Sequence, residues 1–173
     1  VKAERGLLRG IGIKNHFFPT TPMVSKDSKD PIIISSVTLN RYVGGFNADI
    51  VRACAEISKY PIIGWFPTLH TETFLKSHDF EVPKEWIEPE LLKKISLRPT
   101  NSIQPLLIFD QRGEISAEVR AVLDAIKRYD SILATGHLSW QDSVQLVEYA
   151  SSIGIKKIII THPIYQKINM SVD

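Results

Sequence analysis

The chain contains five short runs of consecutive apolar residues, each ended by a polar or turn-forming residue. They lie within GIGIKNHF (10–17), PIIISSVTL (31–39), PIIGWFPTLH (61–70), SILATGHL (131–138) and KKIIITHP (156–163). Continuous apolar runs, unlike alternating ones, are typical of strands in a parallel sheet that is covered on both faces. We therefore expect five parallel strands, the first of them a short buried strand that ends near His16.

Segments with apolar residues at helical spacing lie between these strands. Three of them follow a residue that is typical of a helix N-cap, namely Asn47, Ser116 and Ser139. Gly154 is placed to close the third helix, and residues 1–10 and the Thr21-Pro22 pair predict two further helical pieces. Alternation of strands and helices indicates an α/β fold.

Residues 69–105 break this alternation with a long irregular stretch that contains four prolines and one short helical pattern, EPELLKK. Loops of this length inside a compact domain are usually functional. The 173 residues are a suitable length for one domain. We therefore expect a single domain over 1–173, with 69–105 as an insertion or lid and a small hairpin turning at 110–113.

Composition argues against nucleic-acid binding, against a membrane span and against an internal disulfide. The formal net charge of +2, without a local run of Lys or Arg, gives no support for nucleic acid as a partner. No apolar run approaches the roughly 20 residues that span a bilayer. The single cysteine, Cys54, lies on a helical pattern and excludes an internal disulfide. We expect a cytoplasmic protein with a small-molecule substrate, a buried Cys54 and no membrane partner.

Histidines follow several of the predicted strands, at the ends where parallel α/β folds place their chemistry. His137 and His162 occupy matching positions after two successive strands. Imidazole is the commonest side-chain ligand for zinc and similar ions. We expect both residues to line one site and to bind a metal ion. Ser139 lies close to His137, but its place at a helix start favours an N-cap over a nucleophile.

Lys14 and His16 are two residues apart, so on a strand their side chains would point the same way. This spacing predicts that both contribute to the site as catalytic or metal-binding groups. The alternative is a strand that ends earlier, which would leave Lys14 in solvent. Thr68 and His70 end the third strand as candidates for the pocket wall, with a surface position for His70 equally open, and His78 is expected in solvent.

Arg41, Gly44 and Gly45 follow the second strand in the stretch RYVGGFN. A Gly-Gly turn before a helix can expose backbone N–H groups to an anion, so these residues are candidates for substrate binding. A plain turn followed by the Asn47 cap is an equally good interpretation, because a Gly-Gly pair alone is a weak indication.

The blocks GIKNHFFPT, NRYVGGFN, WFPT, ATGHLS and IITHP, in this order, resemble an uncharacterised family of the metal-dependent hydrolase superfamily. These proteins are amidohydrolase-like (β/α) barrels, related in layout to the polymerase-and-histidinol-phosphatase type. The resemblance implies a TIM-like barrel, present here in part, whose second to sixth strands correspond to the five predicted ones. It also implies one or two divalent metal ions at the carboxyl ends of the strands, and zinc is the ion we expect.

By this resemblance, His137 is similar to the histidine of the fifth strand and His162 to that of the sixth. Lys14 and His16 then fall on the second strand, where Lys14 is a candidate bridging ligand. The chain departs from the pattern because it has no His-x-His strand, no lysine in PIIGWFPT and no placeable late aspartate. We expect a truncated barrel, completed by other chain segments or by a second copy; a complete flavodoxin-like sheet is the alternative.

The function that these expectations favour is metal-dependent hydrolysis of an amide, cyclic amide or ester by a metal-activated water. A phosphoesterase is the alternative within the enzymes, and it would be favoured if Lys14, Arg41 and the Gly-Gly turn formed one anion pocket. The alternative outside the enzymes is a non-catalytic barrel fragment with a role in binding or assembly, including homo-oligomers, because unpaired sheet edges are usually covered.

Overall fold

The computed structural model describes residues 10–24, 32–164 and 168. The described strands form two parallel sheets, one of two strands and one of four. The first sheet pairs β1 (Gly10–Gly12) with β2 (Ile32–Ile34). The second sheet has the order β3 (Ser36–Thr38), β4 (Ile63–Trp65), β5 (Ile132–Ala134) and β6 (Ile158–Ile159). The α/β class that the sequence predicts is confirmed.

The two sheets are joined through the second predicted strand, which is interrupted at Ser35. Before this residue, β2 pairs with β1; after it, β3 pairs with β4 on the other side. Neighbouring strands thus follow the order of the chain, without the reversal that places the first strand of a flavodoxin-like sheet between the second and third. The flavodoxin-like alternative is therefore wrong for the described strands.

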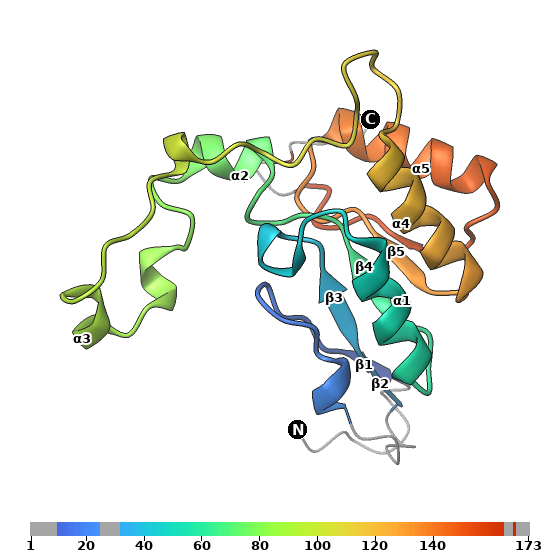
Figure 1. The fold of residues 1–173 in the computed structure, drawn as a ribbon, viewed down its shortest axis with the longest axis horizontal. Coiled ribbons are helices and arrows are strands. Elements are labelled where there is room, and N and C mark those ends of the chain that lie inside the picture. Colours follow the sequence, from blue (N-terminus) through green and yellow to red (C-terminus); the bar gives the residue numbers. More distant parts are fainter. Residues whose placement is uncertain (1–9, 25–31, 165–167, 169–173) are drawn as a thin grey trace.

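Three helices cover one face of the four-stranded sheet (Figure 1). They are α1 (Ala48–Ile57), α4 (Ala117–Arg128) and α5 (Trp140–Ser152). The predicted caps are confirmed, since the side chains of Asn47, Ser116 and Ser139 accept the N–H of Asp49, Val119 and Asp142, respectively. Each such bond satisfies a backbone donor that the helix itself cannot pair. None of the helices in the described ranges is long and apolar enough to cross a membrane.

Strand geometry separates an apolar face from a more polar one, because successive side chains point to opposite sides. Val37 and Leu133 point toward the helices and belong to the main core, which also contains the buried Cys54. Gly64 lies between them, where an added Cβ would come within 3.2 Å of Ile126 of α4. The opposite face carries Ser36, Thr38, Trp65 and Ala134 at registered positions. The candidate chemistry of the chain lies on this second side.

Residues 71–105 extend away from the sheet as an arm (Figure 1). The arm contains α2 (Glu72–Ser77), α3 (Pro89–Leu92) and the 3-10 helices Lys84–Trp86 and Thr100–Ser102. An antiparallel bridge between Phe80 and Pro99 brings its two ends together. The short helix at EPELLKK is present as predicted, and α2 is an element that the pattern did not indicate.

The predictions for the first strand and for the start of the first short helix need correction, and the helix predicted at the N-terminus lies outside the described part. The stretch 10–17 is not a buried strand ending near His16, since β1 ends at Gly12 and its residues are exposed or half-buried. The short helix at the Thr21-Pro22 pair is Thr21–Met23, with Thr20 rather than Thr21 in the cap position. The predicted turn at 110–113 is confirmed by a bridge between Phe109 and Ile115. The helix expected at 1–10 falls almost wholly outside the described residues.

Candidate active site at the carboxyl edge of the sheet

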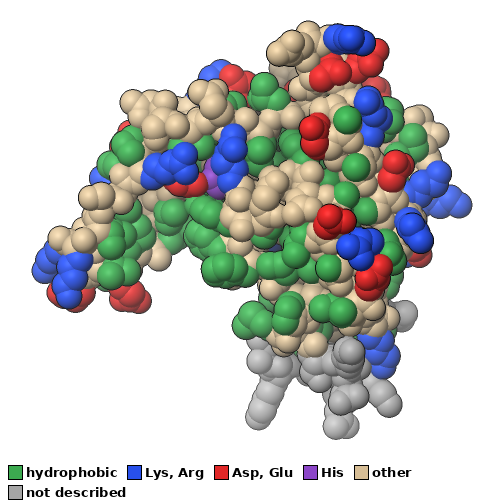
Figure 2. Space-filling model, viewed as in Figure 1, with side chains coloured by type: hydrophobic (Ala, Val, Ile, Leu, Met, Phe, Trp, Pro, Cys, Tyr) green, Lys and Arg blue, Asp and Glu red, His purple; other side chains and the backbone are tan. Residues whose placement is uncertain are grey.

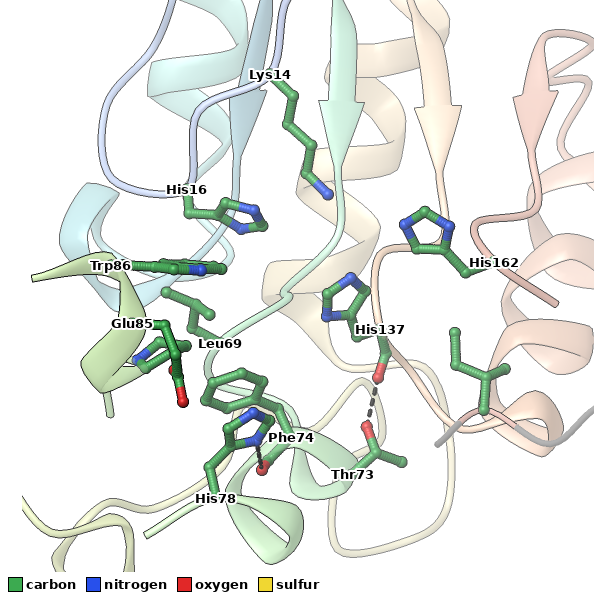
Figure 3. A pocket seen from close by; sticks show the side chains of 12 residues that line it. Lys14, His16, Leu69, Thr73, Phe74, His78, Glu85, Trp86, His137 and His162 are labelled. Atoms are coloured by element: carbon green, nitrogen blue, oxygen red, sulfur yellow. Dashed lines mark hydrogen bonds between the residues drawn. The ribbon is translucent and has the colours of Figure 1, made fainter. Parts of the chain in front are cut away.

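A cavity of about 590 Å³ opens beside the carboxyl ends of β4, β5 and β6 (Figure 3). This volume is in the range of ordinary small-molecule pockets, about 300–1,000 Å³. Loops after the strands and the base of the arm line it together. The lining residues are Lys14, His16, Leu69, Thr73, Phe74, His78, Pro83, Glu85, Trp86, His137, His162 and Ile168.

His137 is held at the cavity by an unusually close approach of two backbone segments. Gly136, which precedes it, has φ +66, and an added Cβ would lie 2.2 Å from the carbonyl oxygen of Phe66. The N–H of His137 then donates to the carbonyl of Pro67 at 2.9 Å. Only glycine fits such a position. The Thr-Gly-His sequence therefore fixes where the imidazole enters the cavity.

His162 is tied to the same edge by two threonines. The N–H of Gly136 donates to Thr161 Oγ1 at 3.2 Å, and the N–H of Thr161 donates to Thr135 Oγ1 at 3.0 Å. His162 itself adopts φ +47, a left-handed conformation that is uncommon outside glycine. The turns after β5 and β6, which carry the two histidines, are thus hydrogen-bonded to each other. The two histidines lie near one edge of the sheet, as their matching sequence positions predict.

Lys14 and His16 face the cavity for a different reason from the one that strand alternation suggests. They follow β1 in a turn, where the Asn15 side chain accepts the N–H groups of Phe17 and Phe18. Lys14 points into the space between the imidazoles of His16, His137 and His162 (Figure 3). The predicted participation of Lys14 and His16 in one pocket with His137 and His162 agrees with the cavity, although the strand that was expected to carry them ends earlier.

Thr68 lies behind His16, held by a buried asparagine, and does not line the cavity. Asn40 Oδ1 accepts the N–H groups of Thr68 and Leu69, and Asn40 Nδ2 donates to Thr68 Oγ1 at 2.9 Å. Thr68 Oγ1 is in turn 2.8 Å from His16 Nδ1. This chain of bonds orients the imidazole and occupies its Nδ1, so that Nε2 is the nitrogen left for other contacts. The sequence indicated Asn40 only by its position directly after a buried strand, and gave no sign of these bonds to Thr68 and Leu69.

The spacing of the imidazoles bears on whether they can share a metal ion. The ring centroids of His137 and His162 are 5.8 Å apart, and those of His16 and His137 are 6.3 Å apart. With Zn–N bonds of about 2.0–2.1 Å, two imidazoles on one tetrahedral ion have centroids about 5 Å apart. The centroid separation of His137 and His162 is within about 1 Å of this value. Over the ranges that the structure describes, no three His, Cys, Asp or Glu side chains are grouped closely enough to hold a metal ion.

Burial keeps the imidazoles of His16 and His137 neutral. Desolvation, and then the nearby charge of Lys14, lower the pKa of His16 to about 4. Desolvation also lowers the pKa of His137 to about 3, with further contributions from Lys14, His16 and His162. Burial lowers the pKa of Lys14 to about 8. Near pH 7 the cavity therefore offers imidazole lone pairs beside one ammonium group.

His70 is not part of this cavity. Its side chain is 0% exposed, its Nε2 is bonded to Glu81 of the arm, and its Nδ1 lies 3.4 Å from the N–H of Arg41. Tyr42 packs edge-on against the ring, with centroids 5.0 Å apart. Burial lowers the pKa of His70, and Glu81 opposes this shift. Among the alternatives for His70, neither a surface position nor a pocket position agrees with these contacts; the residue joins the arm to the sheet.

Arg41, Gly44 and Gly45 also lie away from the cavity. The Arg41 guanidinium donates to the carbonyl of Gln104 at 2.6 and 3.2 Å. The N–H groups of Gly44 and Gly45 donate to the carbonyls of Arg41 and Asn40 inside the turn. The plain-turn interpretation of RYVGGFN is therefore the one that matches the structure, with Gly44 and Gly45 at φ +90 and +70.

The arm brings to the cavity several residues that sequence reasoning did not select. Trp86 stacks against His16 with ring centroids 5.1 Å apart, and Phe74 stacks on His78 at 3.8 Å. The expectation of a solvent position for His78 is wrong, since the residue is half-buried and lines the cavity. Thr73 of α2 donates to the carbonyl of His137. No local pattern could indicate these contacts, because they depend on how the arm folds back.

Comparison with known proteins gives one match. The model of a family described as "Family of unknown function (DUF6282)" matches residues 1–173. No curated protein and no solved structure matches the chain significantly.

Proposed function

We propose a function for this chain, which belongs to the DUF6282 family: it is a metal-dependent hydrolase of small molecules, built on part of a TIM-like barrel. The observation that carries the proposal is that His16, His137, His162 and Lys14, from three separate loops, meet in one cavity beside parallel strand ends. Strands that follow each other in chain order, with helices on one face, also suit a barrel wall.

His137 and His162 are the residues that would hold the ion, which we take to be zinc. They supply two imidazole nitrogens of the three protein ligands that a catalytic zinc site commonly has. A third ligand would be His16 after a side-chain movement, or a residue outside 10–24, 32–164 and 168. When bound, such an ion lowers the pKa of a water molecule and polarises the bond to be cut.

The chain's own residues would prepare the site for this chemistry. His16 keeps its Nδ1 toward Thr68, so its Nε2 can ligate or accept a proton. Lys14 would place an ammonium group beside the imidazoles of the cavity, where it could bind a negative group of the substrate. Trp86 and Phe74, from the arm, would reduce the access of bulk water to the reacting bond.

Amides and esters of carboxylic acids are better supported than phosphate esters. A phosphoesterase would need several cations or backbone donors around the phosphate. Lys14 is the one Lys or Arg among the described lining residues, while Arg41 and the Gly-Gly turn have other partners. A carboxylic ester or amide develops a single negative charge at the reacting carbonyl, which a bound metal ion would balance.

Metal analysis of the whole purified chain tests the proposal. We expect close to one zinc per chain, lost in the double variant His137→Ala, His162→Ala and kept in His78→Ala, which alters the same cavity away from the histidine pair. Hydrolysis of an aryl ester or anilide should fall together with metal content and should return when zinc is restored. A chain that takes up no metal and self-associates tightly would favour the binding or assembly role instead.

A further inference from the structure

At the polar end of the cavity, Lys14 lies among the imidazoles of His16, His137 and His162, with no carboxylate beside it (Figure 3). The ammonium group of Lys14 has three N–H donors, and its one contact among the described residues is the face of Trp65, 4.4 Å from the ring centroid. A half-buried cation without a counter-charge is costly, so this end of the cavity suits an anionic group supplied by a ligand.

The opposite end of the cavity carries aromatic and aliphatic side chains. Trp86 is 51% exposed, with its ring against His16, and it faces the cavity together with Leu69 and Phe74 (Figure 3). A large aromatic side chain that remains half-exposed beside a cavity is a natural surface for stacking a planar ligand. The two ends therefore call for a molecule with an acid group at one side and a flat ring at the other.

We propose that the cavity binds a small planar monocarboxylate, with its carboxylate on Lys14 and its ring between Trp86 and the Leu69–Phe74 wall. This inference names the substrate class of the proposed hydrolase and rests on that function for the fate of the bound molecule. The scissile amide or ester would lie within a few bonds of the acid group, near His137 and His162.

Charge decides between a carboxylate and the other ligands of similar shape. A neutral planar ligand would leave Lys14 without a counter-charge. A phosphate dianion would bring a second negative charge against one ammonium group, with the carboxylate of Glu85 at the rim of the same cavity. Because an unbalanced charge is costly in a desolvated site, the single charge of a carboxylate matches this cavity best.

Calorimetric titration of the chelator-treated chain tests the inference without any need for metal or turnover. The probes are 2-naphthoate, its uncharged amide, its saturated decalin analogue and 2-naphthyl phosphate. We expect 2-naphthoate to bind at least about tenfold more tightly than each of the other three, a ratio that corresponds to about 1.4 kcal/mol. Equal or tighter binding of the amide, the saturated acid or the phosphate would overturn the proposal, as would no binding of 2-naphthoate.

Variants locate the two ends of the ligand. Lys14→Met keeps the aliphatic stem without the charge and should weaken 2-naphthoate about tenfold or more, because a hydrogen bond to a charged group is worth about 1.5–3 kcal/mol. Trp86→Leu should weaken it by a similar factor. Matched controls are Lys76→Met and Trp140→Leu, both at exposed helix positions outside the cavity, where we expect less than about a twofold change.

The outcomes separate this inference from the proposed function. If Lys14→Met binds 2-naphthoate as well as the parent chain, the assigned ligand class is wrong, whatever the metal content of the protein. If the parent chain binds 2-naphthoate as expected but never takes up metal, the ligand class holds and the hydrolase proposal fails.

Discussion

His70 and His137 both follow a buried strand near its carboxyl end, and their surroundings are opposite. His70 is completely buried and bonded to Glu81, with Tyr42 against its edge. His137 faces a cavity, where its ring neighbours are His16 and His162 rather than a carboxylate. The same residue type at similar positions therefore serves in one place to join two parts of the fold and in the other to present a nitrogen to a ligand.

The difference is set by what the arm brings to each histidine. Glu81 comes from the base of the arm and bonds to His70 through one carboxylate oxygen. Arg98, from the segment in which the arm returns, lies 3.8 Å from the other oxygen of Glu81. At His137 the arm contributes the hydroxyl of Thr73, which bonds to the backbone rather than to the ring. A buried histidine is thus structural where a carboxylate reaches it, and available where only backbone contacts hold it.

The largest effect on stability is expected from a substitution in the backbone turn that carries His137. Gly136→Ala combines a left-handed φ with a clash against two carbonyl oxygens, and we expect it to cost about 4 kcal/mol of unfolding free energy or to prevent folding. Gly113→Ala is the matched control, because Gly113 has φ +77 with nothing within 4 Å of an added Cβ. Urea unfolding should give about 1–2 kcal/mol for this control, and equal costs would mean that the close approach is not important.

The next largest effect should distinguish the two histidines directly. His70→Leu leaves the buried carboxylate of Glu81 without its imidazole partner, and we expect a loss of about 3 kcal/mol of stability. His137→Leu places an apolar side chain in a cavity that is already partly apolar, and we expect a change below about 1 kcal/mol. Chemical denaturation of both variants measures the difference. Similar losses would place His137 among the structural residues.

Acid should affect stability through the cavity histidines. Below the ordinary pKa of about 6.5, unfolded histidines bind protons, whereas folded His16 and His137 stay neutral down to pKa values of about 4 and 3. The unfolded state thus binds more protons, so the free energy of unfolding falls as the pH falls from 6.5 toward 3. His137→Gln removes one such group and should reduce this slope by up to about 1.4 kcal/mol per pH unit. Unfolding curves between pH 4 and 7 measure it, and an unchanged slope would contradict the shifted pKa.

The smallest effect concerns the coupling between Lys14 and the imidazoles. Its charge is the second cause, after burial, of the lowered pKa values of His16 and His137. Lys14→Met should therefore raise both pKa values part of the way toward about 6.5, and leave that of His70 unchanged. Titration of the imidazole C–H signals by NMR in metal-free protein checks this. A shift at His70 equal to that at His137 would indicate a general loosening of the fold.

Local features of the fold could be predicted from the sequence because each depends on neighbouring residues. The helix caps at Asn47, Ser116 and Ser139 need only the side chain and the N–H two or three residues later. The meeting of His137 and His162 follows from a general property of parallel sheets, whose carboxyl ends lie along one edge. Lys14 and His16 line one cavity with these histidines, but they reach it from a turn after β1 and not by the strand alternation from which their position was predicted.

Features that depend on distant contacts could not be predicted. The pairing of His70 with Glu81 and the contact of Trp86 with His16 both require the arm to close at Phe80 and Pro99. No periodic pattern in 69–105 indicates that closure. The distribution of charge agrees with the composition. Basic and acidic side chains are interspersed over the face shown in Figure 2, without a continuous basic region.

The bonds that join Thr135, Gly136 and Thr161 have a consequence for how the site responds to occupancy. These hydrogen bonds couple the two turns after β5 and β6, so a shift of one turn would strain the other. A ligand that engages either imidazole will then order both, and departures from the bound arrangement will be concerted rather than independent.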